Sequence, residues 1–384
     1  IKEGEVFYNS TDFKLKSFVS TAAWHSASSM LQKRNAIGGT GTQTAALAFG
    51  GTPGSGYSGA TEEYNGSGFS EVADMNTARG YVGSAGTQTA ALAVAGLGPS
   101  RYDNVENFDG SSWSEISDLN TTRDSVGASG TSTSAVAFGG NPGSSPYFSA
   151  LTEEYNGTSW SEQNDLNTAR NGAAGSGVQT AALAAGGEIS TGASDATEEY
   201  DGTSWTTSGA LNTARYYAGP ATAAPQTDSL IFGGSTPPAG TQTEGYDGTS
   251  WSVKPALANV RRQAGGAGTA SAAVTFGGNS TPPTILATAE EFTVSVSATT
   301  AATWSSGGAA PRGHAGQSMA GNHTDAMMWG GDTGGGYPGW TTTSHSYNGS
   351  SWTSEGAIPT GVSAGGQAGA GHTDATTWGG YKPA

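Results

Sequence analysis

Short alternating runs of large and small apolar residues recur along the chain, and each of them predicts a β-strand. In Ala46-Leu47-Ala48-Phe49, the large side chains of Leu47 and Phe49 fall on one face and the alanines on the other. This period of two is the spacing of side chains along a strand. Such a strand suits a sheet that is stacked between two neighbours, with large residues against small ones. No helical periodicity is found along the sequence.

Each of these runs belongs to a longer unit that is expected to hold four strands. An Ala-, Gly- and Ser-rich segment after an arginine predicts the first strand, and the apolar run that ends in Gly-Gly predicts the second. The segment 152–160, Thr-Glu-Glu-Tyr-Asn-Gly-Thr-Ser-Trp, predicts a hairpin of the third and fourth strands, because Asn-Gly supplies the positive φ that a tight turn needs.

The unit occurs eight times, with a repeat about every 45 residues. Three anchors mark it independently. The Gly-Gly anchor ends at Gly51, Gly96 (here Ala95-Gly96), Gly140, Gly187, Gly234, Gly278, Gly331 and Gly380. The third-strand aromatic residues are Tyr8, Tyr64, Phe108, Tyr155, Tyr200, Tyr246, Phe292 and Tyr347. The fourth-strand aromatic residues are Trp24, Phe69, Trp113, Trp160, Trp205, Trp251, Trp304 and Trp352.

Four-stranded units with this period fit a β-propeller, and the order Gly-Gly, Tyr, Trp resembles the kelch repeat over nearly the whole chain. We therefore predict an all-β fold, an eight-bladed β-propeller of four-stranded kelch-like blades. The chain stops after a second strand, at Trp378-Gly379-Gly380, and starts with a third and a fourth strand, around Tyr8 and Trp24. If the N-terminal strands pair with the C-terminal strands, the last blade is completed and two bare sheet edges are covered. Seven blades plus a tail, and an open solenoid, are the alternatives.

The chain, residues 1–384, is accordingly expected to form a single propeller domain. Residues 1–33 would complete the last blade, residues 34–360 would form seven full blades, and residues 361–384 would supply the inner strands of the closing blade. The spacing from Tyr8 to Trp24 is sixteen residues and that from Phe292 to Trp304 is twelve, where the other six units have five. The extra length makes 13–18 a candidate for an added strand.

The amino-acid sequence of the repeat also resembles virion proteins. Residues 4–18 are similar to a phrase common in bacteriophage tail-fibre and virion proteins. The segments Thr-Glu-Glu-Tyr-Asn-Gly-Thr-Ser-Trp and Leu-Asn-Thr-Ala-Arg are similar to repeats of marine phage structural proteins. This resemblance implies a structural virion protein and says little about chemistry.

Composition excludes several classes of function. The formal net charge of −16 argues against binding of nucleic acid, which needs a basic face. The absence of Cys excludes disulfides, thiolate metal sites and Cys nucleophiles. No apolar run approaches the roughly 18 residues of a membrane span. The 62 glycines resemble low complexity, but ten Trp, fourteen Tyr and eleven Phe at fixed intervals argue against disorder.

Variable loops mark one face of the expected propeller. The loops after second strands and the connections after fourth strands emerge there, whereas the hairpin turns on the other face repeat with little change. Variable loops on a repeated scaffold are the usual place for recognition, and aromatic residues among Gly, Ser, Thr and Asn suit a sugar or a protein partner. Packing of these aromatics against their own loops is the alternative. The candidate ligand-binding residues are Tyr57, Tyr102, Tyr147, Phe148, Tyr337 and Trp340.

A recurring arginine enters the innermost strand near the axis on this same face. A ring of arginines suits an anion, but the regular spacing of both signs favours ion pairs with third-strand carboxylates, which contribute specificity more than stability. The arginines are Arg34, Arg79, Arg123, Arg170, Arg215, Arg261 or Arg262, and Arg312. The carboxylates include Glu62, Glu63, Glu153, Glu154, Glu198 and Glu199.

No cofactor, metal site or catalytic residue is predicted. His323-Thr324-Asp325 and His372-Thr373-Asp374 resemble metal ligands, but they occupy the turn position where other units have Thr-Gln-Thr. A glycoside hydrolase needs a carboxylate pair, and here the acidic pairs recur at one strand position, which indicates architecture.

The sequence therefore predicts a non-enzymatic virion structural protein, a phage tail fibre, knob or decoration module located on the virion or outside the cell. Its variable loops are expected to bind a host cell-surface glycan or protein. The other expected partners are virion proteins, without nucleic acid or membrane insertion, and self-association is left open. A secreted bacterial adhesion or assembly propeller and a glycan-degrading enzyme are the alternatives.

Overall fold

A computed structural model describes residues 6–9, 14–235, 240–280, 284–300, 318–321, 325–331, 341–358, 366–368, 373 and 376–378. These residues form strands, turns and loops and no helix, so the predicted all-β class is confirmed. None of them accordingly lies in a helix long and apolar enough to cross a membrane. The chain divides into two compact units, Ile1–Gly4 with Phe18–Ala298, and Glu5–Ser17 with Thr299–Ala384.

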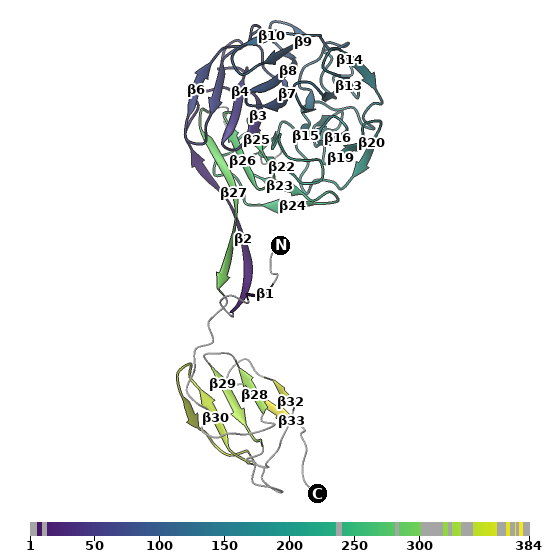
Figure 1. Cartoon of the computed structure of the whole chain (residues 1–384). Coiled ribbons are helices and arrows are strands. Elements are labelled where there is room, and N and C mark those ends of the chain that lie inside the picture. Colours follow the sequence, from purple (N-terminus) through teal and green to yellow (C-terminus); the bar gives the residue numbers. More distant parts are fainter. Residues whose placement is uncertain are drawn as a thin grey trace. The chain divides into compact units, whose positions relative to one another are not determined.

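The larger unit holds six antiparallel sheets, in which the strands are hydrogen-bonded in chain order except where noted (Figure 1). The first three sheets are β3 (Gly38–Thr42), β4 (Ala45–Phe49), β5 (Thr61–Tyr64) and β6 (Phe69–Val72); β7 (Gly83–Thr87), β8 (Ala90–Leu97), β9 (Arg101–Phe108) and β10 (Trp113–Glu115); and β11 (Gly127–Gly130), β12 (Ala135–Phe138), β13 (Thr152–Tyr155) and β14 (Trp160–Gln163).

The fourth and fifth sheets are β15 (Ala174–Val178), β16 (Ala181–Ala185), β19 (Thr197–Tyr200) and β20 (Trp205–Ser208); and β21 (Gly219–Pro220), β22 (Ser229–Phe232), β23 (Thr243–Tyr246) and β24 (Trp251–Lys254). A small hairpin of β17 (Glu188–Ile189) and β18 (Gly192–Ala193) lies in the loop between β16 and β19. The sixth sheet has the order β25 (Gly265–Gly268), β26 (Ala272–Phe276), β27 (Ala289–Thr300), β2 (Lys14–Ala27) and β1 (Val6–Asn9), of which β1, the start of β2 and the end of β27 belong to the smaller unit.

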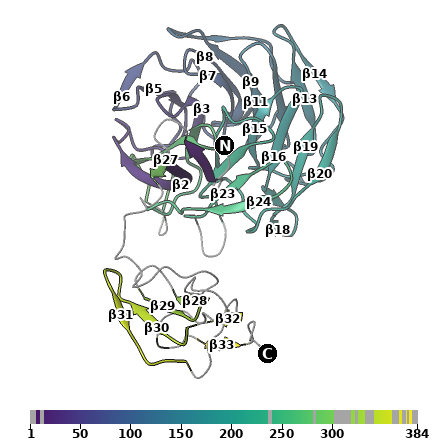
Figure 2. The ribbon, with the colours of Figure 1, turned by 60° about the horizontal axis from the view of Figure 1, so that its bottom comes forward.

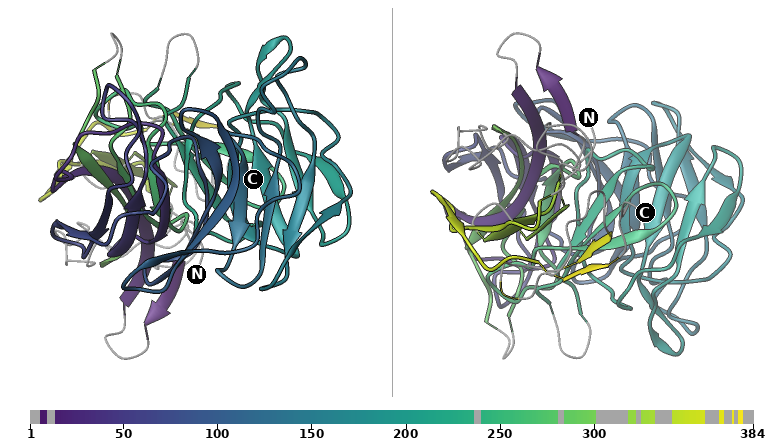
Figure 3. Two further views of the ribbon diagram at one scale, coloured as in Figure 1. Left: turned by 90° about the horizontal axis from the view of Figure 1, so that it is seen from above. Right: turned by 90° about the horizontal axis from the view of Figure 1, so that it is seen from below.

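The sheets of this unit have a propeller-like arrangement. Their first strands β3, β7, β11, β15, β21 and β25 contact one another in this order, and β25 also contacts β3. Figure 1 shows β3, β7, β15 and β25 around the centre, with β6, β20 and β24 at the rim. Neighbouring sheets run side by side in Figures 2 and 3.

The core lies between neighbouring sheets, where large side chains face small ones. Leu47 and Phe49 of β4 pack with Ala91 and Ala93 of β8 in the next sheet. The alanines of β4 face the opposite way and share a cluster with Phe276 of β26. All of these side chains are fully buried, and burial of one large apolar side chain contributes about 1.5–3 kcal/mol. The stacking predicted from the period-two pattern is therefore confirmed.

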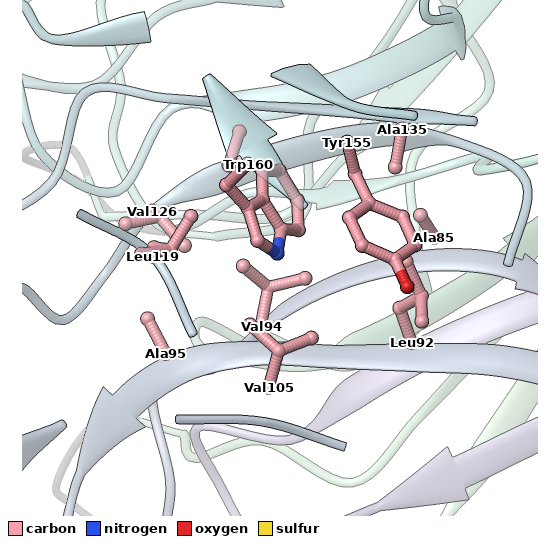
Figure 4. Close-up of a cluster of buried hydrophobic side chains, with 11 residues drawn as sticks. Ala85, Leu92, Val94, Ala95, Val105, Leu119, Val126, Ala135, Tyr155 and Trp160 are labelled. Atoms are coloured by element: carbon pink, nitrogen blue, oxygen red, sulfur yellow. The ribbon is translucent and has the colours of Figure 1, made fainter. Parts of the chain in front are cut away.

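The same packing recurs between the second and third sheets. Figure 4 shows Tyr155 and Trp160 of the third sheet lying against Leu92, Val94 and Val105 of the second. Each interface thus combines the aromatic hairpin of one sheet with the small and branched residues of its neighbour.

The sixth sheet obtains its outer strand from the beginning of the chain, because β2 pairs with β27. Trp24 of β2 packs on Phe232 and Phe292, with ring centroids 5.1 and 5.2 Å apart. We expected the N-terminal strands to pair with inner strands in residues 361–384 and to complete an eighth blade. The structure differs, since Trp24 fills the fourth-strand position beside Phe292 that the repeat pattern had given to Trp304, a residue outside the described ranges. The chain passes from one compact unit to the other at 17/18 and 298/299, and the expected boundaries at 33/34 and 360/361 stay a prediction.

The uniform hairpin face is explained by glutamines that join neighbouring sheets. Nε2 of Gln88 donates to the carbonyl oxygens of Ala46 and Tyr64 in the preceding sheet, at 3.1 and 2.8 Å. Gln179 and Gln226 make the equivalent bonds, and Gln43 binds the sixth sheet through the carbonyl oxygen of Phe292 at 2.8 Å. The repeated Thr-Gln-Thr turns are therefore structural.

The smaller unit contains one four-stranded antiparallel sheet and one two-stranded sheet. The first is β28 (Ser318–Gly321), β29 (Ala326–Trp329), β30 (Ser344–Tyr347) and β31 (Trp352–Ser354), and the second is β32 (Gly366–Ala368) and β33 (Thr376–Trp378). β28 contacts β32. Tyr8 of β1, which belongs to this unit, pairs with Leu15 near the start of β2. The segment 13–18, expected as an added strand, therefore continues directly into the strand that carries Trp24.

Candidate functional site

The recurring arginines are buried and paired with carboxylates, as the regular spacing predicted. In each of the six sheets the arginine that precedes the first strand binds a glutamate of the third strand through Nη2. Five pairs measure 2.5–3.2 Å and the Arg215–Glu244 pair is formed in the same way. The others are Arg34–Glu62, Arg79–Glu106, Arg123–Glu153, Arg170–Glu198 and Arg261–Glu290. Desolvation by burial lowers the pKa of each arginine, and the paired glutamate acts in the opposite direction.

These ion pairs hold the variable loops at their bases. Nη1 of Arg34 donates to the carbonyl oxygens of Gly50 and Ala60, at 2.7 and 2.5 Å, which are the two ends of the loop between β4 and β5. Arg123, Arg170, Arg215 and Arg261 bind both ends of their own loops in the same way. Because these guanidinium groups are fully buried and their Nη atoms bind glutamates and loop carbonyl oxygens, they support the bases of the loops and are not accessible to a soluble anion.

In three of the acidic pairs the second glutamate has a different role. Glu154 accepts a hydrogen bond from the hydroxyl of Tyr200 at 3.0 Å, and Glu291 accepts one from Tyr64 at 2.7 Å. Tyr246 binds Glu199 in the same manner. The expectation that Glu154 and Glu199 pair with arginines is therefore corrected: these carboxylates bind the tyrosine of the following sheet instead.

A ring of six backbone hydrogen bonds encloses the axis at the entry to the innermost strands. Its members stand two positions after each arginine: Ala36, Tyr81, Ser125, Gly172, Tyr217 and Gln263. The amide of each member donates to the carbonyl oxygen of the preceding one at 2.8–3.0 Å, and the amide of Ala36 donates to Gln263. All six have φ between 52° and 60°, a left-handed conformation that is uncommon for residues other than Gly. The ring thus fixes five side chains and Gly172 at the mouth of the axial channel.

The side chains of this ring end two hydrogen-bond chains. In the first, Tyr217 Oη is 3.2 Å from Ser125 Oγ, which donates to Asp124 Oδ1 at 2.7 Å, and Arg101 pairs with Asp124 at 2.6 Å. Since the Ser125 hydrogen is directed at Asp124, the Tyr217 hydroxyl donates to Ser125. The Tyr217 oxygen keeps a lone pair that faces no partner among the described residues.

The second chain starts at the only one of these loop-face arginines without a carboxylate partner among the described residues, Arg262. Its Nε donates to Asn279 Oδ1 at 2.9 Å, and Asn279 Nδ2 donates to Gln263 Oε1 at 3.2 Å. Gln263 Nε2 donates to the Tyr81 hydroxyl oxygen at 3.1 Å, which leaves the Tyr81 hydrogen available. The Tyr81 and Tyr217 rings are 5.8 Å apart, so the two chains meet at the axis.

Burial favours the neutral forms of the ionisable groups at the mouth of the channel, Tyr81, Tyr217 and Asp124. Desolvation raises the pKa of Tyr81, against the opposing effects of the Gln263 hydrogen bond and the Arg262 charge, and the neighbouring Tyr57 adds to the rise. Desolvation also raises the pKa of Tyr217 and of Asp124, and for Asp124 the Ser125 hydrogen bond and Arg101 oppose it. Both phenols are therefore protonated at neutral pH: the Tyr81 hydrogen is available to a ligand, and the Tyr217 hydrogen is donated to Ser125.

Below the ring the channel is narrow. A cavity of about 90 Å³ follows the axis, lined by Tyr81, Ser125, Tyr217, Gln263 and the small residues of the innermost strands. That volume holds a few water molecules. A larger ligand would therefore be bound at the mouth, between the side chains of the ring and the variable loops. Neither a protein-family model nor a curated protein matches the chain.

The structure places four of the six candidate loop aromatics. Tyr57 is partly buried in the loop between β4 and β5, and its charge contributes to the raised pKa of Tyr81. The Tyr102 ring lies directly on Gly98, where a Cβ would approach it to 2.5 Å, so this residue packs against its own hairpin. Tyr147 is 55% exposed and Phe148 is partly buried in the β12–β13 loop. Tyr337 and Trp340 lie outside the described residues. A binding role for these side chains stays a prediction.

Sequence reasoning missed the axial residues Tyr81, Tyr217 and Gln263, and it named Arg262 only as the alternative to Arg261. A signal for them exists, because the residue two positions after each arginine differs in a unit that is otherwise repeated closely. In the described ranges no group of three or more His, Cys, Asp or Glu residues could hold a metal ion. Of the expected turn histidines, His323 and His372 lie outside those ranges, as does Arg312.

Proposed function

We propose that the chain is a non-catalytic recognition protein and that its larger unit is a six-bladed propeller which binds through the loop face. This proposal rests on the contrast between the repeated arginine–glutamate pairs at the bases of the loops and the variable residues at the mouth of the axial channel. Six buried arginines and glutamates are repeated without change, while the six ring positions directly above them carry Ala, Tyr, Ser, Gly, Tyr and Gln. A scaffold that stays constant while its exposed centre varies is typical of proteins that bind through loops.

Contacts at three levels support this number of blades. The ring of amide bonds returns to Ala36 after six members, Gln43 of the first sheet binds the sixth, and Trp24 supplies the aromatic residue of the sixth outer strand. These contacts favour six blades over the eight expected from the repeat count.

The resemblance between the repeated sequence and phage structural proteins supports a virion location. We propose a tail fibre, knob or decoration protein whose loop face contacts a host-surface glycan or protein and which is anchored to other virion proteins. A secreted bacterial adhesion propeller would present the same face, and gene neighbourhood distinguishes these two.

A glycan-degrading enzyme is disfavoured by the state of the repeated carboxylates. Glycoside hydrolysis needs one protonated carboxylic acid and one free carboxylate around the substrate. Glu62, Glu153 and Glu198 are instead buried in ion pairs, with relative exposures of 1% each. Nothing about these residues distinguishes one blade as a catalytic one.

Binding to bacterial cells tests the proposal. Fluorescently labelled chain should bind a subset of a panel of bacterial strains and should reduce phage adsorption to those strains. Tyr147→Ala and Tyr57→Ala, on the loop face, should weaken binding. Thr158→Ala, in an exposed hairpin turn on the opposite face, should leave it unchanged. Equal loss in all three variants, or no binding to any strain, contradicts the proposal.

A further inference from the structure

The mouth of the axial channel, which we call the axial mouth, combines tyrosine side chains that suit a saccharide with one positively charged residue, Arg262. Tyr81 offers a hydroxyl hydrogen and Tyr217 a hydroxyl lone pair, and their rings are inclined at 60°. A third ring, Tyr216, lies 5.2 Å from Tyr217. Sugars present hydroxyl groups that both donate and accept, and they present C–H faces that pack on aromatic rings. A free donor and a free acceptor beside aromatic rings match that chemistry.

Arg262 adds a charge that no carboxylate among the described residues neutralises. Arg34, Arg79, Arg123, Arg170, Arg215 and Arg261 each pair with a buried glutamate, and Arg101 pairs with Asp124. Arg262 contacts only neutral groups among the described residues, Asn279 at 2.9 Å and Ser235 at 3.4 Å. It is partly exposed, so several of its N–H groups remain for a ligand.

The positions equivalent to Arg262 show that this charge is specific to one blade. In the other five sheets the residue after the repeated arginine is Asn35, Gly80, Asp124, Asn171 or Tyr216. Each forms a backbone bridge to the residue that follows Gly-Gly, as Arg262 does to Asn279, so the backbone requires no arginine here. In a chain of net charge −16, one unneutralised cation beside the axis favours an anionic group at that point.

We propose that the axial mouth binds an acidic saccharide, a uronate- or sialate-type residue, with its carboxylate on Arg262 and its hydroxyl groups on Tyr81 and Tyr217. This inference deepens the proposed function, on which it rests, by naming the class of host-surface ligand. Asn279 and Gln263 position these groups, since they join Arg262 to Tyr81. A carboxylate can accept two parallel hydrogen bonds from a guanidinium group, which makes the site selective for a planar anion.

A matched pair of probes tests the carboxylate. Trigalacturonate and its carboxyl-reduced neutral counterpart differ only in charge and in the carboxylate oxygens, and a glycan array containing uronate and sialate glycans covers the rest of the class. The full chain should bind acidic glycans at least about tenfold more tightly than the neutral counterparts, as expected for one charge-assisted contact. Calorimetry or saturation-transfer NMR gives the dissociation constants.

Variants then assign the contacts. Arg262→Gln should remove the preference for the acidic probe, whereas Lys254→Gln, the same change of charge on outer strand β24, should retain it. Tyr81→Phe and Tyr217→Phe should weaken acidic and neutral probes alike. No acidic glycan bound by the folded chain, or an unchanged preference in Arg262→Gln, overturns the inference. If Arg262→Gln still binds cells while Tyr147→Ala does not, the proposed function stands and the acidic-saccharide site falls. If no variant loses cell binding but the full chain still prefers acidic glycans, the acidic-saccharide site stands and the proposed function falls.

Discussion

The indole Nε1 of Trp24 donates a hydrogen bond to Thr243 Oγ1 at 3.0 Å, across 219 residues of sequence. The same bond joins Trp113 to Thr61, at 3.1 Å, and recurs for Trp205 with Thr152 and Trp251 with Thr197, at 2.9 Å. A fourth-strand tryptophan therefore binds a third-strand threonine of the preceding sheet. Trp24 obeys this rule although it comes from the other end of the unit.

Two positions depart from this rule in different ways. The side chain of Phe69 has no N–H group to donate. The residue that faces it at the threonine position is Ala289, which has no acceptor in its side chain, so neither side chain is left without a hydrogen bond. Trp160 faces Val105 instead, and its Nε1 is buried without a hydrogen-bond partner (Figure 4). A buried donor without a partner costs about 1–3 kcal/mol.

Val105→Thr should therefore stabilise the protein. The new hydroxyl restores the bond that the other sheets have, and we expect the free energy of unfolding to rise by about 1 kcal/mol. Urea denaturation followed by tryptophan fluorescence measures it. Val94→Thr is the control, because Val94 belongs to the same buried cluster but does not occupy the threonine position of the repeat. Destabilisation of both variants by the same amount would show that Trp160 gains nothing.

The arginine–glutamate pairs should be costly to break on one side. Arg170→Met leaves Glu198 buried without its cation and leaves the carbonyl oxygens of Gly186 and Ala196 without their donor. We expect a loss of about 3–5 kcal/mol at pH 7. The loop 186–196 should also become sensitive to proteases. Lys254→Met, on an outer strand, should change stability by less than about 0.5 kcal/mol. An Arg170→Met protein as stable as Lys254→Met would contradict a structural role.

Stability should fall at alkaline pH through the buried tyrosines. Burial and the hydrogen bond to Glu199 raise the pKa of Tyr246 to about 12, and burial with a glutamate partner also raises the pKa of Tyr64 and Tyr200. In the unfolded chain these phenols ionise near pH 10. The folded protein therefore holds more protons than the unfolded one above that pH, and stability decreases from about pH 10 toward pH 12. Below pH 10 this contribution is constant.

Urea midpoints between pH 8 and 11.5 measure the effect. Tyr200→Phe removes one titrating group, so its midpoint should depend less steeply on pH than that of the unchanged protein. Its stability at pH 8 should be lower by about 1 kcal/mol, because Glu154 loses its donor. A midpoint that stays constant to pH 11.5 would rule out the buried phenols as the cause.

The sequence predicts the repeated features well because each is local or periodic. The alternation of Leu47 and Phe49 with alanines gives both the strand and the stacking, and the spacing of Arg and Glu-Glu gives the ion pairs. The repeat cannot show which aromatic residue completes which sheet, since Trp24 and Trp304 fit the same pattern. That choice depends on contacts with Phe232, Phe292 and Thr243, which are distant in sequence.

The axial site was missed for a related reason. Tyr81, Tyr217 and Gln263 stand in a segment that differs between units, and no repeat pattern connects them. They become neighbours only because six left-handed residues form one ring of amide bonds. The loop aromatics were easier to find because they interrupt a run of Gly, Ser and Thr.

The contact of Trp24 with Thr243 also predicts how the larger unit can be divided. Residues 18–298 contain all six inner strands and the part of β2 that carries Trp24, so this fragment should fold alone. A fragment of residues 28–298 lacks that strand. It exposes the edge of β27 and leaves Thr243, Phe232 and Phe292 without the indole, and an exposed edge favours association. We expect it to aggregate or to melt at a lower temperature.

A synthetic peptide of residues 14–27 should restore the shorter fragment. The peptide adds the missing strand through backbone hydrogen bonds to β27, and Trp24 selects the register by its bond to Thr243. Binding should raise the melting temperature and shift the Trp24 emission to shorter wavelength. The same peptide with Trp24→Ala should bind much more weakly, since it loses both ring contacts and the hydrogen bond. If residues 28–298 fold as stably without the peptide as with it, β2 is dispensable and the sixth sheet is complete with three strands.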